Sequence, residues 1–114
     1  MLLPESEYPR FHQDRVNLAI HIVMVPLFVA CAVCALWSLI TGRWLWAGLL
    51  AAAPALSMAV QGVGHKREVH PPLPFEGPKD VLLRIFVEQF YTFPRFVLSG
   101  RFLRAWRKRA QLAP

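Results

Sequence analysis

The hydrophobic pattern of the chain is dominated by one long apolar stretch. Residues 16–63 carry a single formal charge, Arg43, which lies near the middle of the stretch. A helix that spans a bilayer needs about 20 apolar residues in succession, and the segments 16–40 and 44–63 both meet this requirement. Residues 41–43 separate the two segments as a turn. The pattern therefore predicts two transmembrane helices that fold back on each other as a hairpin.

The rest of the chain is more polar and predicts interfacial structure. Residues 71–78 contain four prolines, which indicates a stiff, non-helical strap. Apolar positions at helical spacing then predict amphipathic helices over 79–93 and 99–110. Arg84 and Glu88, an i,i+4 pair on the polar face of the first of these, argue against a third span. We therefore expect a single-domain, all-α membrane protein over 1–114.

Composition and charge support a membrane location. Fifty-five per cent of the residues are hydrophobic and the mean hydropathy is +0.36, whereas a soluble domain of this size must keep much of its surface polar. Of the 13 Lys and Arg residues, only Arg43 lies at the turn, and the other twelve flank the outer ends of the spans. Because cytoplasmic segments are enriched in basic residues, both termini are predicted to be cytoplasmic, in a bacterial inner membrane or the endoplasmic reticulum.

The C-terminal basic segment fits the same picture. Its cations alternate with Phe102, Leu103 and Trp106, a pattern typical of a segment that lies on anionic headgroups. We therefore expect a bilayer as its partner and no nucleic acid. Cys31 and Cys34 lie within the first span, where thiols serve as small apolar packing groups.

All four histidines lie at the same end of the predicted hairpin. His12 and His21 bracket the start of the first span, and His65 and His70 follow the end of the second. Folding the hairpin about its midpoint leaves His21 and His65 about 4.5 Å apart in depth, at the helical rise of 1.5 Å per residue. His12 joins them only if the first helix begins after it, because a continuous helix would turn His12 to the opposite face.

A cluster of imidazoles at membrane depth predicts a metal site. Burying an ionisable group at membrane depth costs free energy, so such a group is expected to have a function. Imidazole is a good ligand for Fe, Zn, Cu and Ni. The four histidines, with Glu68 as a further candidate ligand, suit Fe(2+) with a position open to oxygen. Zn(2+) fits the same set, and anchoring histidines without any metal are the alternative. Asp14, Asn17 and Gln61 share these helix faces and are expected to support the ligands or to hydrogen-bond between helices.

Two groups of residues resemble the Mpo1-like family. The first is Tyr8-Pro-Arg-Phe-His12 followed by Asn17-Leu-Ala-Ile-His21 and Val25-Pro26, and the second is Gln61-Gly-Val-Gly64-His65 followed by Glu68. The resemblance extends over residues 8–76. It implies a membrane enzyme that uses Fe(II) and O₂ to shorten 2-hydroxy fatty acids by one carbon. It also implies His12, His21 and His65 as ligands at the catalytic centre.

We therefore expect an Fe(II)-dependent dioxygenase of 2-hydroxy fatty acids at the cytoplasmic membrane face, with the substrate carboxylate held by Lys66 or Arg67. The alternative is a non-enzymatic membrane scaffold or subunit that binds a partner or anionic lipid. Small residues recur every four positions in the second span and allow close approach of another helix, including in a homo-oligomer: Ala47, Ala51, Ala55 and Ala59. A polar stripe through Gln61 and His65 runs on a different face, and the sequence does not decide which face meets the first helix.

Overall fold

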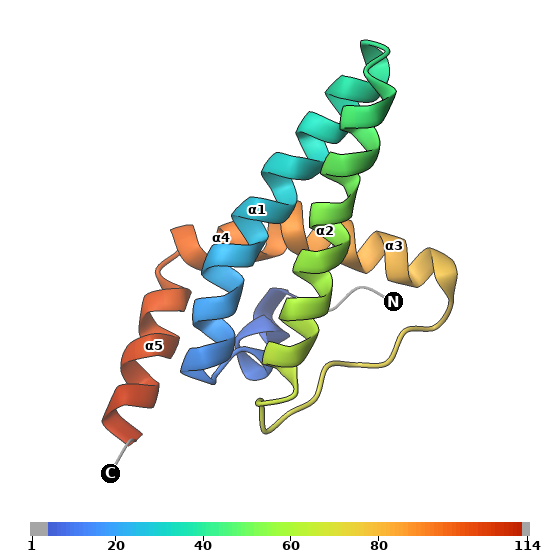
Figure 1. Ribbon diagram of the computed structural model, residues 1–114. Helices are drawn as coiled ribbons and strands as arrows, with labels where there is room; N and C mark the ends of the chain where they lie inside the picture. Colours follow the sequence, from blue (N-terminus) through green and yellow to red (C-terminus); the bar gives the residue numbers. More distant parts are fainter. Residues whose placement is uncertain (1–4, 113–114) are drawn as a thin grey trace.

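A computed structural model describes residues 5–112 and shows an all-helical chain (Figure 1). Two long helices, α1 (Arg15–Ile40) and α2 (Trp44–His65), pack side by side as a hairpin. Gly42 turns the chain between them with a left-handed φ of 76°, a conformation that glycine adopts at little cost. The predicted hairpin is confirmed, and α2 continues past the expected end at residue 63 to His65.

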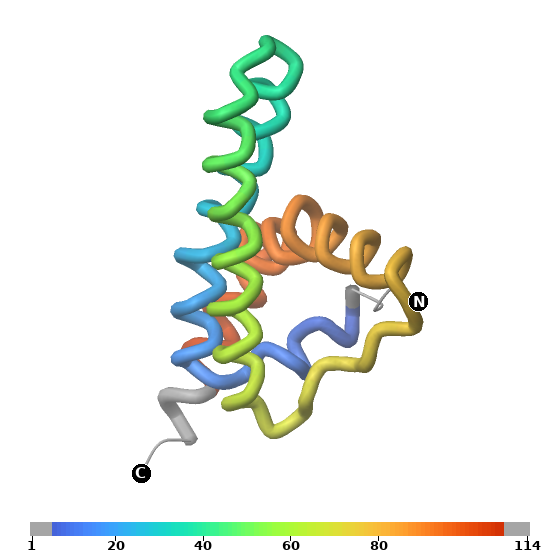
Figure 2. Tube along the Cα trace, turned by 45° about the vertical axis from the view of Figure 1, so that its right-hand side comes forward, coloured from blue at the N-terminus to red at the C-terminus, as the bar shows by residue number. Residues whose placement is uncertain are grey.

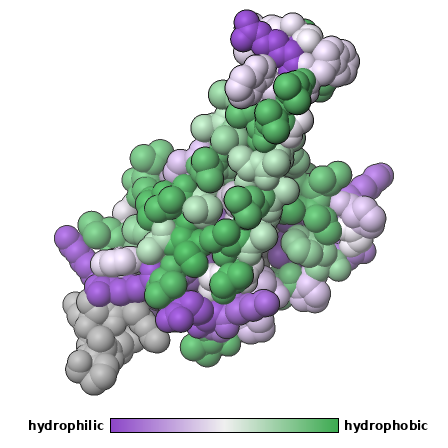
Figure 3. All heavy atoms as spheres, in the orientation of Figure 1, coloured by the Kyte–Doolittle hydropathy of each residue, from purple (hydrophilic) through white to green (hydrophobic). Residues whose placement is uncertain are grey.

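Both hairpin helices are long and apolar enough to cross a membrane. With 26 and 22 residues, they measure about 39 and 33 Å, against a hydrocarbon core of about 30 Å. In the most apolar 18-residue stretch of each helix, only 22% and 17% of the residues are buried by the rest of the chain. Their apolar side chains are therefore mostly exposed, and Figure 3 shows this apolar surface between a polar tip and the polar opposite end.

The remaining elements lie around the half of the hairpin opposite the turn, with α3 (Pro78–Val87) and α4 (Phe93–Leu98) crossing near its middle (Figures 1 and 2). A 3₁₀-helix, η1 (Glu5–Phe11), precedes α1, and the proline-rich strap leads from α2 to α3. The chain then passes through the π-helical turn η2 (Glu88–Thr92) into α4, and α5 (Arg101–Leu112) packs beside α1. A small core joins η1, α1 and α4: Tyr8, Leu18, Val25, Phe93 and Phe96.

The C-terminal helices differ in their bounds from the predicted segments 79–93 and 99–110. The helical path continues across Pro94, where a break or kink was expected. Pro94 lies at the start of α4 and has no backbone N–H to donate to the preceding turn. The wider η2 turn comes directly before it and shifts the hydrogen-bond register, since Phe93 N–H donates to the Glu88 carbonyl.

The two hairpin helices meet along a polar seam. The buried residues of α2 are Ser57, Gln61 and Gly64. Ser57 Oγ donates to the Met24 carbonyl of α1 at 2.7 Å, and Gln61 exchanges two 2.9 Å hydrogen bonds with Gln89 of η2. The polar stripe therefore faces inward. Three of the four alanines in the predicted ridge are exposed on the chain, and their part in oligomerisation remains a prediction.

Candidate metal centre

Three histidines from three different segments meet at the end of the hairpin opposite the turn. His12 follows η1, His21 lies in α1 and His65 ends α2. Their candidate ligand atoms all lie within 4.8 Å of one another. The three ring centroids are 4.8–4.9 Å apart in pairs, with interplanar angles of 79–89°. The fold thus places three imidazoles around one small volume.

The start of α1 explains how His12 reaches this group. Helix α1 begins at Arg15, and the Asp14 side chain caps it by accepting a hydrogen bond from Asn17 N–H at 3.1 Å. The backbone between η1 and α1 is not helical. A continuous helix would have placed His12 on the face opposite His21, and this break allows His12 to point toward it.

Backbone carbonyls fix the proton positions of two of the histidines. His12 Nδ1 lies 3.0 Å from the Tyr8 carbonyl oxygen, and His21 Nδ1 lies 2.9 Å from that of Asn17. Because a carbonyl oxygen only accepts, both Nδ1 atoms carry the proton and both Nε2 lone pairs remain available. His12 Nε2 and His65 Nδ1 are buried and have no hydrogen-bond partner. A metal ion would satisfy such nitrogens.

Aromatic side chains cover one side of the site. The Tyr8 ring stacks on His12 at a centroid distance of 3.9 Å, while Phe96 and Phe93 lie near His12 and His21. Burial, reinforced by the neighbouring imidazoles, lowers the pKa of His12 well below its usual value. His12 is therefore neutral near pH 7, which is the form that binds metals.

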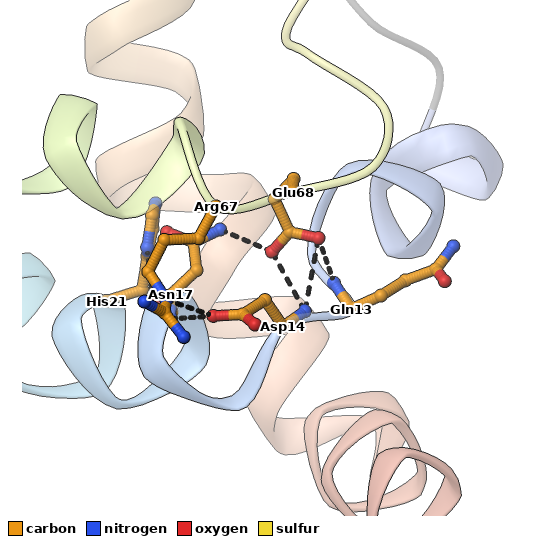
Figure 4. Close-up of polar contacts among 6 residues, drawn as sticks. All are labelled: Gln13, Asp14, Asn17, His21, Arg67 and Glu68. Atoms are coloured by element: carbon orange, nitrogen blue, oxygen red, sulfur yellow. Dashed lines mark hydrogen bonds and ion pairs between the residues drawn. The ribbon is translucent and has the colours of Figure 1, made fainter. Parts of the chain in front are cut away.

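Glu68, a predicted ligand, directs its oxygens at other groups (Figure 4). The carboxylate accepts hydrogen bonds from the backbone N–H of Gln13 at 2.8 Å and of Asp14 at 3.0–3.1 Å. It also accepts one from Asn17 Nδ2 at 2.7 Å. Asn17 is the residue whose carbonyl orients His21, so Glu68 supports the histidine indirectly.

The structure gives local partners to the other candidates. Arg67 Nε pairs with Asp14 at 3.0 Å, and Gln61 hydrogen-bonds within the polar seam. His70 lies in the turn region after α2, and the three-histidine group does not include it. The metal- and substrate-binding roles predicted for these residues remain predictions.

The contacts of Glu68 predict a structural cost for removing its charge. Glu68→Gln replaces one acceptor oxygen with an N–H donor, which then faces the backbone N–H of Asp14 and that of Gln13, or the backbone N–H of Asp14 and the side-chain N–H of Asn17. We expect the free energy of unfolding to fall by about 1–3 kcal/mol, measured by titrating the protein in mixed micelles with a denaturing detergent. Unchanged stability would contradict the role of Glu68 in holding the start of α1.

A cavity of about 420 Å³ lies beside the histidines, within the size range of ligand pockets. His12, His65 and Lys66 line one part of it, and η1, α2, the strap and α3 supply the other walls. The strap is held in place by Arg84 of α3. Its Nη1 donates to the Leu73 carbonyl at 3.0 Å and to the Pro74 carbonyl at 3.2 Å. Arg84, expected on a polar helix face, is instead buried under the strap.

Sequence reasoning gave no role to two residues that shape the site. Tyr8 covers the His12 ring, and the i,i+4 spacing of the two was a usable signal. Gly64 allows a close approach between the hairpin helices, because a Cβ atom there would overlap Asn17 Oδ1 and come within 3.3 Å of Ile20 Cδ1. The sequence signal for this role was the position of Gly64 directly before His65, a candidate ligand.

Comparison with known proteins identifies one family. A family model described as "2-hydroxy-palmitic acid dioxygenase Mpo1-like" matches residues 5–96. No curated protein and no solved structure gives a significant match. The matched region contains the hairpin, the three histidines and the residues that line the cavity. Since it covers most of the chain, the protein belongs to the Mpo1-like family.

Proposed function

We propose that this protein is an Fe(II)-dependent dioxygenase that shortens 2-hydroxy fatty acids by one carbon. The observation that carries the proposal is the group of three histidines whose ligand atoms lie within 4.8 Å of one another. The donor set fits a metal, since two of its nitrogens are buried without a partner. The family description names a 2-hydroxy fatty acid as the substrate.

Iron is the metal that best combines the ligands with the chemistry. Imidazole suits Fe, Zn, Cu and Ni, but Zn²⁺ has no redox chemistry. A bound Fe(II) would supply the activation of O₂ that a dioxygenase requires. Zn²⁺ would therefore occupy the site without supporting the reaction.

The residues of the chain hold and shield this centre. His12, His21 and His65 would be the ligands, and the carbonyls of Tyr8 and Asn17 orient two of them. The stacked Tyr8 ring and the neighbouring phenylalanines exclude water from one side. The cavity on the other side receives the substrate.

We place the hairpin across a bilayer, with the histidines near the cytoplasmic face. His21 lies far from the turn along α1, and all but one of the basic residues flank the outer ends of the two spans in the sequence. Because cytoplasmic segments are enriched in basic residues, both termini are cytoplasmic in this arrangement. Fatty acids dissolved in the membrane then reach the centre without leaving the bilayer.

The activity is tested with 2-hydroxypalmitate. Protein purified in detergent and loaded anaerobically with Fe(II) should convert it to pentadecanoate with consumption of O₂. Palmitate, which lacks the 2-hydroxyl group, is the matched control and should yield no shortened acid. Loaded protein that binds iron but leaves 2-hydroxypalmitate intact would contradict the proposed reaction.

The exposed alanine ridge favours a second candidate function. Three small residues on one face of α2 remain uncovered, as on a helix that packs against another helix in the membrane. The protein would then be a scaffold or subunit. A chain that takes up no transition metal after anaerobic loading would support this function over the enzyme.

A further inference from the structure

Two basic side chains reach the cavity beside the histidines. Lys66 follows His65 directly and lines the cavity. Within residues 5–112, no acidic side chain pairs with its ammonium group. Arg84 lines the same cavity, and its Nε–H is buried without a hydrogen-bond partner. The cavity therefore offers the unpaired ammonium group of Lys66 to an anion, whereas Arg84 contributes a positive charge to the wall but is engaged by the strap carbonyls, Asp80 and Glu88.

The other walls of the cavity are mostly apolar. They come from η1, α2, the strap and α3, and include Phe11, Met58, Leu73, Phe75 and Ile85. An apolar pocket with a few convergent polar groups is the usual form of a small-molecule site. Such walls suit an alkyl chain, and the cations suit a charged head.

Glu88 is the acidic group that lines this cavity, and the cation within 4.0 Å of it is Arg84 rather than Lys66. Its Oε1 lies 4.0 Å from Arg84 Nε, outside hydrogen-bond range. Burial raises the pKa of the Glu88 carboxyl group, while Arg84 partly offsets the rise. Asp80 lies 3.7 Å from Arg84 Nη1, on the side of the guanidinium that faces the strap carbonyls. The Lys66 charge has no such counter-ion and is the main attraction for an anion.

We propose that Lys66 binds the carboxylate of a long-chain fatty acid whose alkyl chain occupies this cavity. The inference rests on the proposed function, for which it names the substrate anchor. Charge-assisted hydrogen bonds to a carboxylate are among the strongest that proteins form. Because Lys66 adjoins His65, this anchor holds the carboxyl end of the acid beside the three histidines. Arg67, the other predicted anchor, pairs with Asp14 and does not line the cavity.

The test compares two ligands of equal chain length, palmitate and 1-hexadecanol, on iron-free protein in neutral detergent. Each displaces radiolabelled palmitate, and the ratio of their dissociation constants measures the preference for a carboxylate. Wild-type protein should prefer palmitate by about tenfold or more, as expected for a charge-assisted hydrogen bond. Lys66→Met should abolish most of this preference. Lys79→Met, which removes an exposed lysine outside the cavity, is the matched control and should keep it.

Two further variants sharpen the result. Arg84→Lys retains the positive charge but loses the Nη1 hydrogen bonds that hold the strap, so it should weaken the binding of palmitate and hexadecanol alike while the preference for palmitate is kept. A wild-type protein without preference, or a preference that survives in Lys66→Met, overturns the proposal. A preference lost in Arg67→Met but kept in Lys66→Met overturns it in favour of the anchor predicted from the sequence.

The failure of this inference is separable from the failure of the proposed function. Palmitate lacks the 2-hydroxyl group, and the protein contains no iron, so binding is measured without turnover. A protein without the carboxylate preference would contradict the anchor but not the metal centre. Protein that prefers palmitate but never binds iron counts against the proposed function alone.

Discussion

Replacing His21 with alanine should abolish stoichiometric iron binding. The His21 imidazole is one of three candidate ligands, is 2% exposed and is held by the Asn17 carbonyl. Loss of a residue that merely supports a ligand already weakens metal affinity by about 10–100-fold, so loss of the ligand itself should exceed this. The measurement is the iron content per chain after anaerobic loading and removal of free metal. The same variant should form no pentadecanoate from 2-hydroxypalmitate.

His70→Ala separates a ligand effect from the general loss of a histidine. His70 lies after α2 and outside the three-histidine group, so this variant should retain iron at the wild-type level. Circular dichroism of both variants should show the same helical content, which excludes unfolding as the cause. Full iron occupancy in His21→Ala would contradict the three-histidine centre. Loss of iron in His70→Ala would add a fourth ligand that the geometry does not include.

Replacing Gly64 with alanine should disrupt the centre without touching a histidine. A methyl group at this position would overlap Asn17 Oδ1, and Asn17 both binds Glu68 and orients His21. Overpacking of this kind typically costs about 1–3 kcal/mol. We therefore expect a lower free energy of unfolding, measured in mixed micelles, together with weaker iron binding.

Gly62→Ala is the matched control within the same helix. A Cβ atom at Gly62 meets nothing within 4 Å, and alanine favours a helix over glycine by up to about 1 kcal/mol. This variant should be as stable as the wild type or more so, with unchanged iron binding. If Gly64→Ala and Gly62→Ala had the same stability and the same iron binding, the close approach of the helices at Gly64 would not be needed for either property.

The local sequence was sufficient to predict the hairpin and part of the centre. One uninterrupted apolar stretch with a charged turn defines two spans, because few other arrangements accommodate so much exposed apolar surface. Helical rise alone places His21 and His65 at a similar depth once the turn is fixed. Their ring centroids are 4.8 Å apart in the structure, so the predicted proximity is confirmed.

Other features depend on contacts between distant segments and could not be predicted in the same way. His12 reaches the cluster because Asp14 caps α1 and Glu68 binds the backbone before it. The helix across Pro94 depends on a π-helical turn, for which the sequence has no simple signal. The burial of Arg84 depends on where the strap folds back, which residue spacing does not specify.

The most direct test of the three-histidine centre is X-ray absorption spectroscopy of the protein loaded anaerobically with Fe(II). The geometry predicts one iron per chain with scattering from three imidazole rings, those of His12, His21 and His65. His21→Ala should remove this signal, whereas His70→Ala should leave it intact. An iron environment without imidazole, or a folded chain that binds no iron, would contradict the centre on which the proposed function rests.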